Sequence, residues 1–246
     1  MKIIAVYAIK GGVGKTATAV NLAYLSAKQG LRTLIWDLDA QGACSYYFRI
    51  KPKVKGGTKG LLKNKADLDH LIKGTDFDGL DLLPADFSNR NFDLLLDDKK
   101  KPTQQLRKLL QQFEGQYDVV FLDCPPGITL LSEAILTAAE IVLSPIIPTT
   151  LSLRTLEQLK AFIQANKLDN LQFVPFFSMV DRRKKSHLDY LQAFTEQYPE
   201  FLKAMIPNAS EIERMGIERM PLTAFDCKTR SAKAYQQLWQ ELQPII

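Results

Sequence analysis

The sequence predicts an α/β protein, with a single doubly wound domain over residues 1–246 and a mostly parallel sheet flanked by helices. Three observations lead to this class. Apolar strand-like runs alternate with helical patterns along most of the chain, which indicates a parallel sheet with helices on both faces. A glycine-rich loop containing two lysines follows the first of these runs directly. Two further apolar runs end in aspartate, and ligands bind at such strand ends in open α/β sheets.

The individual elements follow from the same patterns. Continuous apolar runs predict buried strands, and apolar residues at helical spacing between them predict helices. Strands are expected at residues 1–8, 32–38, 80–84, 118–123, 140–147 and 171–177. Helices are expected at residues 16–29, 66–73, 103–113, 131–139, 152–166 and 231–242. Residues 51–65 contain six lysines, three glycines and no acidic residue, which predicts an exposed loop or short lid.

Length and composition fit one enzyme-sized domain. The 246 residues, 46% of them hydrophobic, are enough for a large core, and α/β folds of this length are often single domains. Three widely spaced cysteines form neither a disulfide framework nor a zinc spacing. The chain opens with a strand instead of a secretory leader, and no apolar run reaches the length of a membrane span. We therefore expect a cytoplasmic protein without membrane insertion.

The loop after the first strand has the composition of a phosphate-binding loop. It reads Lys-Gly-Gly-Val-Gly-Lys-Thr. Gly11, Gly12 and Gly14 let backbone N–H groups turn toward phosphate oxygens, Lys15 reaches the β- and γ-phosphates, and the Thr16 hydroxyl binds Mg²⁺. The helix that follows directs its positive end at the same anion. The alternative, a glycine-rich turn without a ligand, is disfavoured by the order of strand, loop, helix and second strand.

Two later runs supply carboxylates. The strand at residues 33–38 leads into Asp37 and Asp39, which lie one residue apart and so point the same way off the strand. An Asp-x-Asp pair alone is a weak motif and is more often a strand-end cap. Asp123 follows a run of four apolar or aromatic residues, Val119 to Leu122, and should lie at the tip of a buried strand. The neighbouring Cys124 is either a redox or cluster ligand or a packed small residue, and the absence of a nearby second cysteine favours packing.

The loop with its early lysine, Lys10, resembles the deviant phosphate loop of the ParA/MinD family of ATPases. The resemblance runs nearly end to end and is most specific at residues 10–16, 37–42 and 123–127. It implies ATP and Mg²⁺ as cofactors, hydrolysis of ATP to ADP and phosphate, and a homodimer in the ATP state.

The resemblance also implies a role for each site residue. Lys10 would cross to the partner's nucleotide as a lysine counterpart of an arginine finger. Asp39 would orient the attacking water, Asp37 would support Mg²⁺ and its water shell, and Asp123 resembles the Walker B aspartate. The Gly127 N–H would sense the γ-phosphate. The expected catalytic residues are Lys10, Lys15 and Asp39, and the expected metal-binding residues are Thr16, Asp37 and Asp123.

Two turns in the last third of the chain are expected to hold the adenine base. Ser178 and Met179 stand at the family's base-side position, and Ile206-Pro207-Asn208 resembles its Ile-Pro turn. The tail over residues 219–235 resembles the family's closing segment. The expected nucleotide-binding residues are Gly11, Gly12, Val13, Gly14, Lys15, Thr16, Ala17, Ser178, Met179, Pro207 and Asn208.

The charge of the chain helps to choose between the DNA-binding and the membrane-binding branches of the family. The net charge is +5, with basic clusters at residues 51–65, 99–101 and 182–185. Such a surface permits binding to a phosphate backbone, although a charged run is equally an ordinary solvated face. Arg182, Arg183, Lys184 and Lys185 are the best candidates for DNA contact. The membrane-binding branch has a basic amphipathic helix after the last core helix, and here only residues 243–246 follow, too few for one.

The sequence therefore predicts an ATP-dependent, dimerising switch ATPase that binds DNA non-specifically. It would partition or position a plasmid, a chromosome or a large protein cargo, associate with the nucleoid, and be stimulated by an adaptor protein. The alternative is a MinD-like positioning ATPase or carrier scaffold that does not bind DNA. Cluster carriers usually have paired cysteines, which this chain lacks. A third class comprises ligases such as the cobyrinic acid a,c-diamide synthases, which are expected to carry an additional glutamine-hydrolysing domain.

Overall fold

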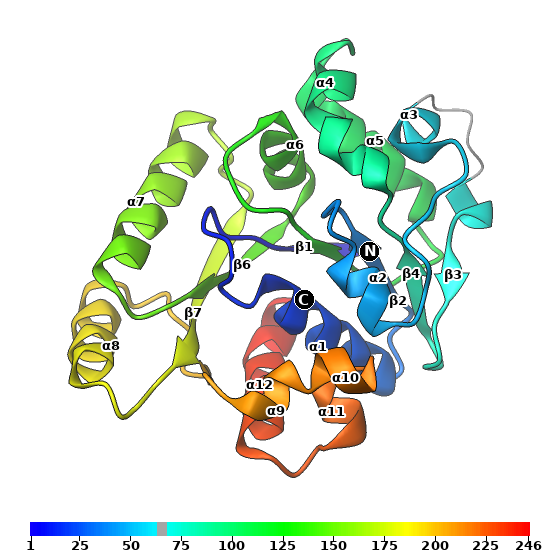
Figure 1. Ribbon diagram of the computed structural model, residues 1–246. Helices are drawn as coiled ribbons and strands as arrows, with labels where there is room; N and C mark the ends of the chain where they lie inside the picture. The colour runs from blue at the N-terminus through cyan, green and yellow to red at the C-terminus, as the bar shows by residue number, and fades with distance from the viewer. Residues whose placement is uncertain (63–67) are drawn as a thin grey trace.

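A computed structural model describes residues 1–62 and 68–246, and in these residues eight strands form one sheet (Figure 1). The strand order is β3-β4-β2-β5-β1-β6-β7-β8, and every neighbouring pair is parallel except β3 with β4. The strands are β1 Lys2–Val6, β2 Thr33–Asp37, β3 Lys73–Gly74, β4 Leu80–Leu83, β5 Val119–Asp123, β6 Ile141–Ile146, β7 Gln172–Val180 and β8 Met205–Pro207. The predicted fold class is confirmed.

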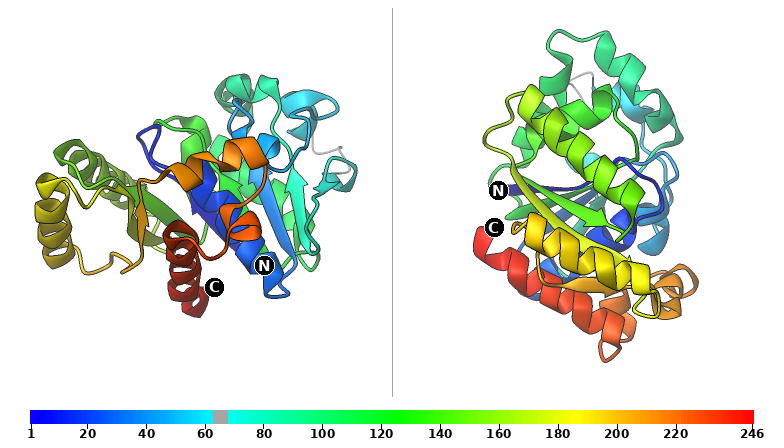
Figure 2. Two further views of the ribbon diagram at one scale, coloured as in Figure 1. Left: turned by 60° about the horizontal axis from the view of Figure 1, so that its bottom comes forward. Right: turned by 90° about the vertical axis from the view of Figure 1, so that its left-hand side faces the viewer.

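Helices cover both faces of the sheet (Figure 2). Helices α1 and α12 pack on one face, helices α4 to α7 pack on the other, and α7 and α8 form a smaller cluster with β7. No helix among the described residues is long and apolar enough to cross a bilayer. The helices are α1 Lys15–Lys28, α2 Ala43–Tyr47, α3 Gly57–Leu61, α4 Phe92–Asp97, α5 Gln105–Leu110, α6 Leu130–Ala138, α7 Thr150–Ala165, α8 Lys185–Gln197, α9 Ser210–Glu213, α10 Met215–Glu218, α11 Leu222–Phe225 and α12 Arg230–Leu242. Single 3₁₀ turns lie at Leu68–His70, Phe87–Asn91, Pro102–Gln104, Gln111–Phe113 and Gln243–Ile245.

The central strand β1 is buried on both faces, which explains its continuous apolar sequence. Ile4 and Val6 pack in the cluster formed with α1 and α12, whereas Ala5 and Tyr7 pack in the cluster formed with α4, α5 and α6. Polar side chains have no place inside such a strand unless they are paired. Functional groups are therefore confined to the strand ends and to the loops that follow them.

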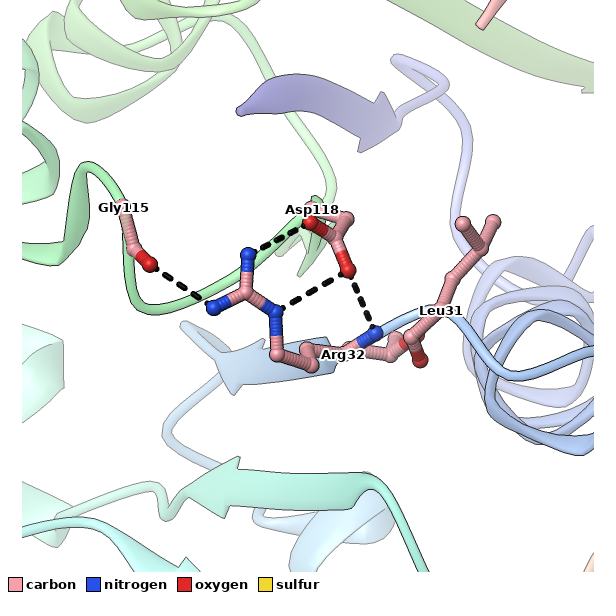
Figure 3. Close-up of polar contacts among 5 residues, drawn as sticks. Leu31, Arg32, Gly115 and Asp118 are labelled. Carbon is pink, nitrogen blue, oxygen red and sulfur yellow. Dashed lines mark hydrogen bonds and ion pairs between the residues drawn. The ribbon is translucent and has the colours of Figure 1, made fainter.

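An ion pair joins the amino ends of β2 and β5 (Figure 3). The Arg32 guanidinium donates to both carboxylate oxygens of Asp118, at 3.1 and 2.7 Å, and to the Gly115 carbonyl at 2.8 Å. The Arg32 backbone N–H also donates to Asp118 at 2.8 Å. These hydrogen bonds lower the pKa of the Asp118 carboxyl to about 2. Arg32 precedes Asp37 by as many residues as Asp118 precedes Asp123, so the parallel register that brings the ion pair together also sets the two acidic residues side by side at the other end.

Most predicted strands are confirmed to within a few residues, but the predicted helix at residues 66–73 is wrong. Residues 66 and 67 lie outside the described residues, Leu68–His70 forms a single 3₁₀ turn, and Lys73–Gly74 is the edge strand β3. The backbone of β3 pairs antiparallel with Leu82 and Asp81 of β4. This pairing with the strand that follows seven to nine residues later outweighs the weak helical pattern of the segment.

Other corrections concern segments with polar or mixed sequences. The helix predicted at residues 103–113 is divided, with α5 between two 3₁₀ turns. The loop predicted at residues 51–65 contains the short helix α3, and residues 63–65 lie outside the described residues. Helices α4 and α8 were not predicted. In α8 the residues His187, Leu191 and Phe194 are buried at helical spacing, a pattern hidden by the charged residues around them.

Candidate functional site

The carboxyl ends of β1, β2 and β5 bring together residues of three separate motifs. Asp37 ends β2 and Asp123 ends β5, and the two are register partners in the parallel pair. The loop after β1 leads to Thr16, whose hydroxyl donates to Oδ1 of Asp123 at 3.2 Å. Lys15 begins α1 beside them and is buried. The structure thus places the predicted metal-binding residues next to the predicted phosphate loop.

The phosphate loop is shaped by its glycines and supported by β7. Gly12 and Gly14 have φ values of 69° and 92°, in the left-handed region that favours glycine. A Cβ atom on Gly14 would lie 3.0 Å from the hydroxyl oxygen of Ser178, so the loop and β7 are closely packed. The same Ser178 hydroxyl donates to the Val13 carbonyl at 2.8 Å. The loop is therefore held by a contact from a strand distant in the sequence.

Lys15 is placed to bind an anion at this loop. Its side chain is 7% exposed, and its ammonium donates to the Lys10 carbonyl at 3.2 Å. Burial lowers the pKa of Lys15, while the nearby carboxylates of Asp123 and Asp39 oppose that shift. An ammonium can donate three hydrogen bonds. Within the described residues it makes this one, so it keeps donors for a phosphate.

Each of the two buried carboxylates has one oxygen without a hydrogen-bond partner. Oδ2 of Asp37 accepts from the N–H and the hydroxyl of Ser45, at 2.8 and 2.7 Å, and Oδ1 of Asp123 accepts from Thr16. Oδ1 of Asp37 and Oδ2 of Asp123 are buried without such a partner. Burial raises the pKa of Asp37 to about 6 and that of Asp123 well above its usual range, and the Asp37 carboxylate adds to the shift of Asp123. The pair is costly unless a positive charge joins it.

These unpaired oxygens fit a divalent cation of the Mg²⁺ type. Mg²⁺ prefers oxygen ligands and usually takes one or two carboxylates together with phosphate oxygens and water. The Thr16 hydroxyl, Asp37 and Asp123 supply such donors at the mouth of the phosphate loop. Among residues 1–62 and 68–246 no group of three or more His, Cys, Asp or Glu side chains forms a self-contained metal site. Because Mg²⁺ usually completes its coordination with phosphate oxygens and water, these donors suit a cation that is shared with phosphate.

We expect Asp37→Asn to raise the melting temperature of the protein in EDTA by about 2–4 °C, the shift that 1 kcal/mol gives in a domain of this size. The substitution removes one of two buried like charges but keeps an oxygen that can accept from Ser45. It should also abolish the stabilisation that added Mg²⁺ gives to the parent. Thermal unfolding with EDTA and with Mg²⁺ measures both effects. Asp97→Asn, at an exposed position on α4, is the control. An unchanged response of Asp37→Asn to Mg²⁺ would contradict the assignment.

Asp39 lies beyond the end of β2 and differs from Asp37 in its surroundings. It is half-buried, and its Oδ1 accepts from the Gln41 N–H at 2.9 Å. This bond closes the turn that leads through Gly42, with φ 66°, into α2. The charge of Asp39 raises the pKa of both Asp37 and Asp123. Asp39 therefore shares the site but stands at its more open side, where water can reach it.

A cavity of about 230 Å³ adjoins the phosphate loop on the side of β7 and β8. It brings together predicted residues that lie far apart in sequence. Its lining residues are Gly12, Gly14, Ala17, Ser178, Met179, Ile206, Pro207, Asn208, Ala209, Ile212, Glu213 and Tyr235. Met179 has a φ of 53°, which is unusual for a non-glycine residue, and it lies where the register of β7 and β8 shifts. This strained position at the cavity wall is typical of a functional site.

Sequence reasoning did not predict Ile212, Glu213 or Tyr235 as lining residues. Tyr235 could have been predicted, because it lies in the tail segment that resembles the family's closing segment. No sequence pattern pointed to Ile212 and Glu213, which the short helix α9 brings to the cavity. Ser178 was predicted to contact the adenine base, but in the structure its hydroxyl donates to the Val13 carbonyl. The hydroxyl oxygen can therefore only accept a hydrogen bond from a base.

The loop between β5 and α6 also differs from expectation at Gly127. The Gly127 N–H, predicted to sense the γ-phosphate, donates to the Ile9 carbonyl at 2.9 Å in this structure. Its carbonyl accepts from the Tyr7 hydroxyl at 2.6 Å. Cys124 is buried, and its thiol donates to the Leu122 carbonyl at 3.3 Å, as expected for a packed residue. A role for the Gly127 N–H at a phosphate would require the bond to Ile9 to break.

The four basic residues predicted to contact DNA lie where β7 continues toward α8 (Figure 1). All four are exposed. Arg183 forms a bidentate ion pair with Asp181, with N–O distances of 2.9 and 3.0 Å. Its charge is therefore already balanced by a neighbour. Arg182, Lys184 and Lys185 carry the net positive charge of this segment.

Comparison with known proteins identifies relatives over the whole chain. A family model described as an AAA domain (AAA_31) matches residues 1–173. The sporulation initiation inhibitor protein Soj of Bacillus subtilis is 29% identical over 247 residues, covering 98% of both chains. The chromosome partitioning protein ParA of Caulobacter vibrioides is 29% identical over 251 residues, covering 98% of this chain and 94% of the relative.

Solved structures share the fold. Cobyrinic acid a,c-diamide synthase from Mycobacterium smegmatis with bound ADP and magnesium superimposes with a TM-score of 0.82 at 26% identity, over 99% of this chain and 94% of that one. A plasmid partition protein from Borrelia burgdorferi bound to AMPPNP gives a TM-score of 0.84 at 24% identity, over 100% and 99%. The phosphate loop and the paired carboxylates agree with these matches. The chain belongs to the AAA_31 family of AAA domains and to the ParA-type ATPases.

Proposed function

We propose that this protein is an Mg²⁺-dependent ATPase that acts as a dimerising switch on DNA. ATP would assemble a homodimer that binds DNA non-specifically, and an adaptor protein would stimulate hydrolysis and release the monomers. The cargo would be a plasmid, a chromosome or a large protein assembly, and the protein would associate with the nucleoid. The observation that best supports ATP hydrolysis is the pair of unpartnered oxygens of Asp37 and Asp123 beside Thr16 and Lys15.

The residues of this site suit phosphoryl transfer to water. Backbone N–H groups of the glycine-rich loop and of the first turn of α1 would bind the phosphates. The Lys15 ammonium would release its hydrogen bond to the Lys10 carbonyl and donate to the β- and γ-phosphates instead. Asp39 would orient a water molecule whose oxygen bonds to the γ-phosphorus as the bond to the β–γ bridging oxygen breaks, which yields ADP and phosphate. Bound Mg²⁺ would neutralise developing charge on the phosphate oxygens.

Dimerisation is proposed from the position of Lys10. It stands at the outer end of the phosphate loop, followed by the exposed Gly11 and Gly12. Among the described residues its ammonium makes no hydrogen bond or ion pair, while its backbone carbonyl accepts from Lys15. A lysine with these surroundings is available to a nucleotide held by a second copy of the chain. It would supply charge to the transition state in trans.

DNA binding is expected to require ATP and to weaken steeply with salt. Each neutralised phosphate contributes a slope of about −0.9 to the dependence of log K on log salt. A dimer doubles the number of contacts, so the ATP state should bind more tightly than the monomer. Replacing Arg182, Lys184 and Lys185 with alanine should flatten the slope and leave basal ATPase activity unchanged. Filter binding of random duplex DNA across a salt series, with ATP and with ADP, measures this.

The matched control is Arg183→Ala, because the Arg183 charge is already paired with Asp181. We expect it to change the slope less than any of its three neighbours. A second control replaces the exposed Lys100 and Lys101, which lie between α4 and α5. Equal binding in ATP and ADP, or no binding at low salt, would reject the DNA-binding proposal. The MinD-like alternative without DNA binding would then take its place.

The amide-forming ligase class was expected to need an additional domain. The solved chain from Mycobacterium smegmatis that carries the name of such an enzyme matches this chain over 94% of its length. Length therefore does not separate the two classes. Hydrolysis of ATP in the absence of a carboxylic acid substrate and an amine donor would favour the switch ATPase, since a ligase couples the two reactions.

A further inference from the structure

Tyr7 joins the strand β1 to the loop that follows β5. It comes directly after β1 and its side chain is 1% exposed. Its hydroxyl donates to the Gly127 carbonyl at 2.6 Å, while the Gly127 N–H donates to the Ile9 carbonyl at 2.9 Å. Both polar groups of Gly127 are thus bound by the short segment between β1 and the phosphate loop.

Elsewhere the loop between β5 and α6 is fixed at its ends. Asp123 is held at the end of β5, and a capping box between Thr129 and Ser132 begins α6. In this box the Thr129 N–H donates to the Ser132 hydroxyl at 2.7 Å, and the Ser132 N–H donates to Thr129 Oγ1 at 3.4 Å. Between these ends Pro126 and Ile128 are exposed. Among the hydrogen bonds that the structure describes, those of Gly127 attach the middle of the loop to the protein.

The two bonds of Gly127 belong to different peptide units. Its N–H lies in the peptide that joins it to Pro126, whereas its carbonyl lies in the peptide that joins it to Ile128. Gly127 has a φ of 97°, and the absence of a Cβ atom allows rotation between the two units. The N–H can therefore turn away from Ile9 while the carbonyl stays bound to Tyr7.

We propose that Tyr7 is a positioning residue that anchors the Gly127 carbonyl, so that only the preceding peptide has to rotate when a γ-phosphate binds. This proposal rests on the proposed binding of ATP at the phosphate loop. The anchor keeps the loop ordered before and after the rotation, and an ordered loop loses less conformational entropy on binding. ADP lacks the γ-phosphate, so its binding does not use the anchor.

The hydroxyl of Tyr7 is suited to a constant anchor. Burial raises the pKa of Tyr7 to about 12, with Ser132 close enough to oppose part of that shift. The hydroxyl therefore stays protonated, and stays a donor, at neutral pH. A buried tyrosine hydroxyl needs a partner, and this one has its partner in a loop that reaches the metal-binding Asp123.

The test is Tyr7→Phe, which keeps the ring and removes the hydroxyl. We expect unchanged affinity for ADP and about fivefold weaker affinity for ATPγS with Mg²⁺, the fold-change that corresponds to the net effect of one hydrogen bond. Competition with a fluorescent nucleotide measures both. Hydrogen exchange in the peptide covering residues 124–131 should be faster than in the parent, already without nucleotide.

The matched control is Tyr117→Phe. The Tyr117 hydroxyl donates to Asp81 at 2.9 Å near the amino end of β5, so the same atom is removed away from the site. It should change neither the ratio of ATPγS to ADP affinity nor exchange in residues 124–131. Equal loss of both affinities in Tyr7→Phe, or unchanged loop exchange, would overturn the proposal. Hydrogen exchange is measured without nucleotide, so it tests the anchoring of the loop by Tyr7 even if the protein proves not to be an ATPase. Failure of the anchor and failure of the proposed ATPase function can therefore be told apart.

Discussion

Replacing Lys15 with alanine is expected to weaken the affinity for both ATP and ADP strongly. The Lys15 ammonium is buried at the phosphate loop beside the carboxylates of Asp123 and Asp39. Truncating one partner of a buried charge pair costs about 2–5 kcal/mol, so affinity should fall by roughly 30-fold to several thousandfold. Titration with a fluorescent ADP analogue measures the loss. Lys28→Ala, at the exposed far end of the same helix α1, is the control and should bind normally.

Lys10→Ala separates the two lysines of the loop. It removes an ammonium without a partner among the described residues but leaves the Lys10 carbonyl that positions Lys15. Monomer binding of ADP and ATP should persist, whereas ATP-dependent dimerisation should be lost. Size exclusion with ATP and Mg²⁺, run beside the same titration, distinguishes the outcomes. Equal loss of nucleotide affinity in Lys10→Ala and Lys15→Ala would rule out action across a dimer.

Asp39→Ala is expected to slow hydrolysis by about a hundredfold or more, the typical contribution of a side chain that handles the proton of the attacking group. Nucleotide binding should persist, so the ATP dimer should accumulate. Phosphate release measures the rate, and size exclusion with ATP and Mg²⁺ measures the lifetime of the dimer. Since Asp39 lies outside the buried pair of Asp37 and Asp123, the folded state should be largely unaffected.

The Asp39 carboxylate also closes a turn through Gln41, and a second variant separates the two roles. Asp39→Asn keeps an oxygen that can accept from the Gln41 N–H but removes the charge. Hydrolysis should remain slow in Asp39→Asn if the carboxylate orients water. A parental rate in this variant, with loss only in Asp39→Ala, would assign Asp39 to the turn alone.

Much of the site could be predicted because it depends on strand ends. Asp37 and Asp123 each terminate an apolar run, and in a parallel sheet such ends meet at one edge. The phosphate loop carries its own conformation in its glycines, and Thr16 follows it directly. For these residues, local sequence and the parallel arrangement of strands were enough to place the side chains near one another.

The contacts made by Ser178 and Tyr7 could not be predicted in the same way. Ser178 supports the phosphate loop because β7 brings its hydroxyl to the Val13 carbonyl. Tyr7 binds Gly127 because the loop after β5 returns to the end of β1. Both contacts depend on long-range packing, and neither has a local pattern. The helix predicted at residues 66–73 was wrong for a different reason, since a short hairpin pairing of β3 with β4 decides the structure of Lys73–Gly74.

The two outer strands of the sheet also limit how copies of this chain can associate. An exposed strand edge is a template on which a second chain can pair its backbone, which leads to open-ended fibres. Here β3 has only two residues, one of them Lys73, and β8 has three, including Pro207, which has no N–H to donate. Neither edge offers a long row of free backbone groups. In the part of the chain that the structure describes, polymerisation by sheet extension is thus disfavoured.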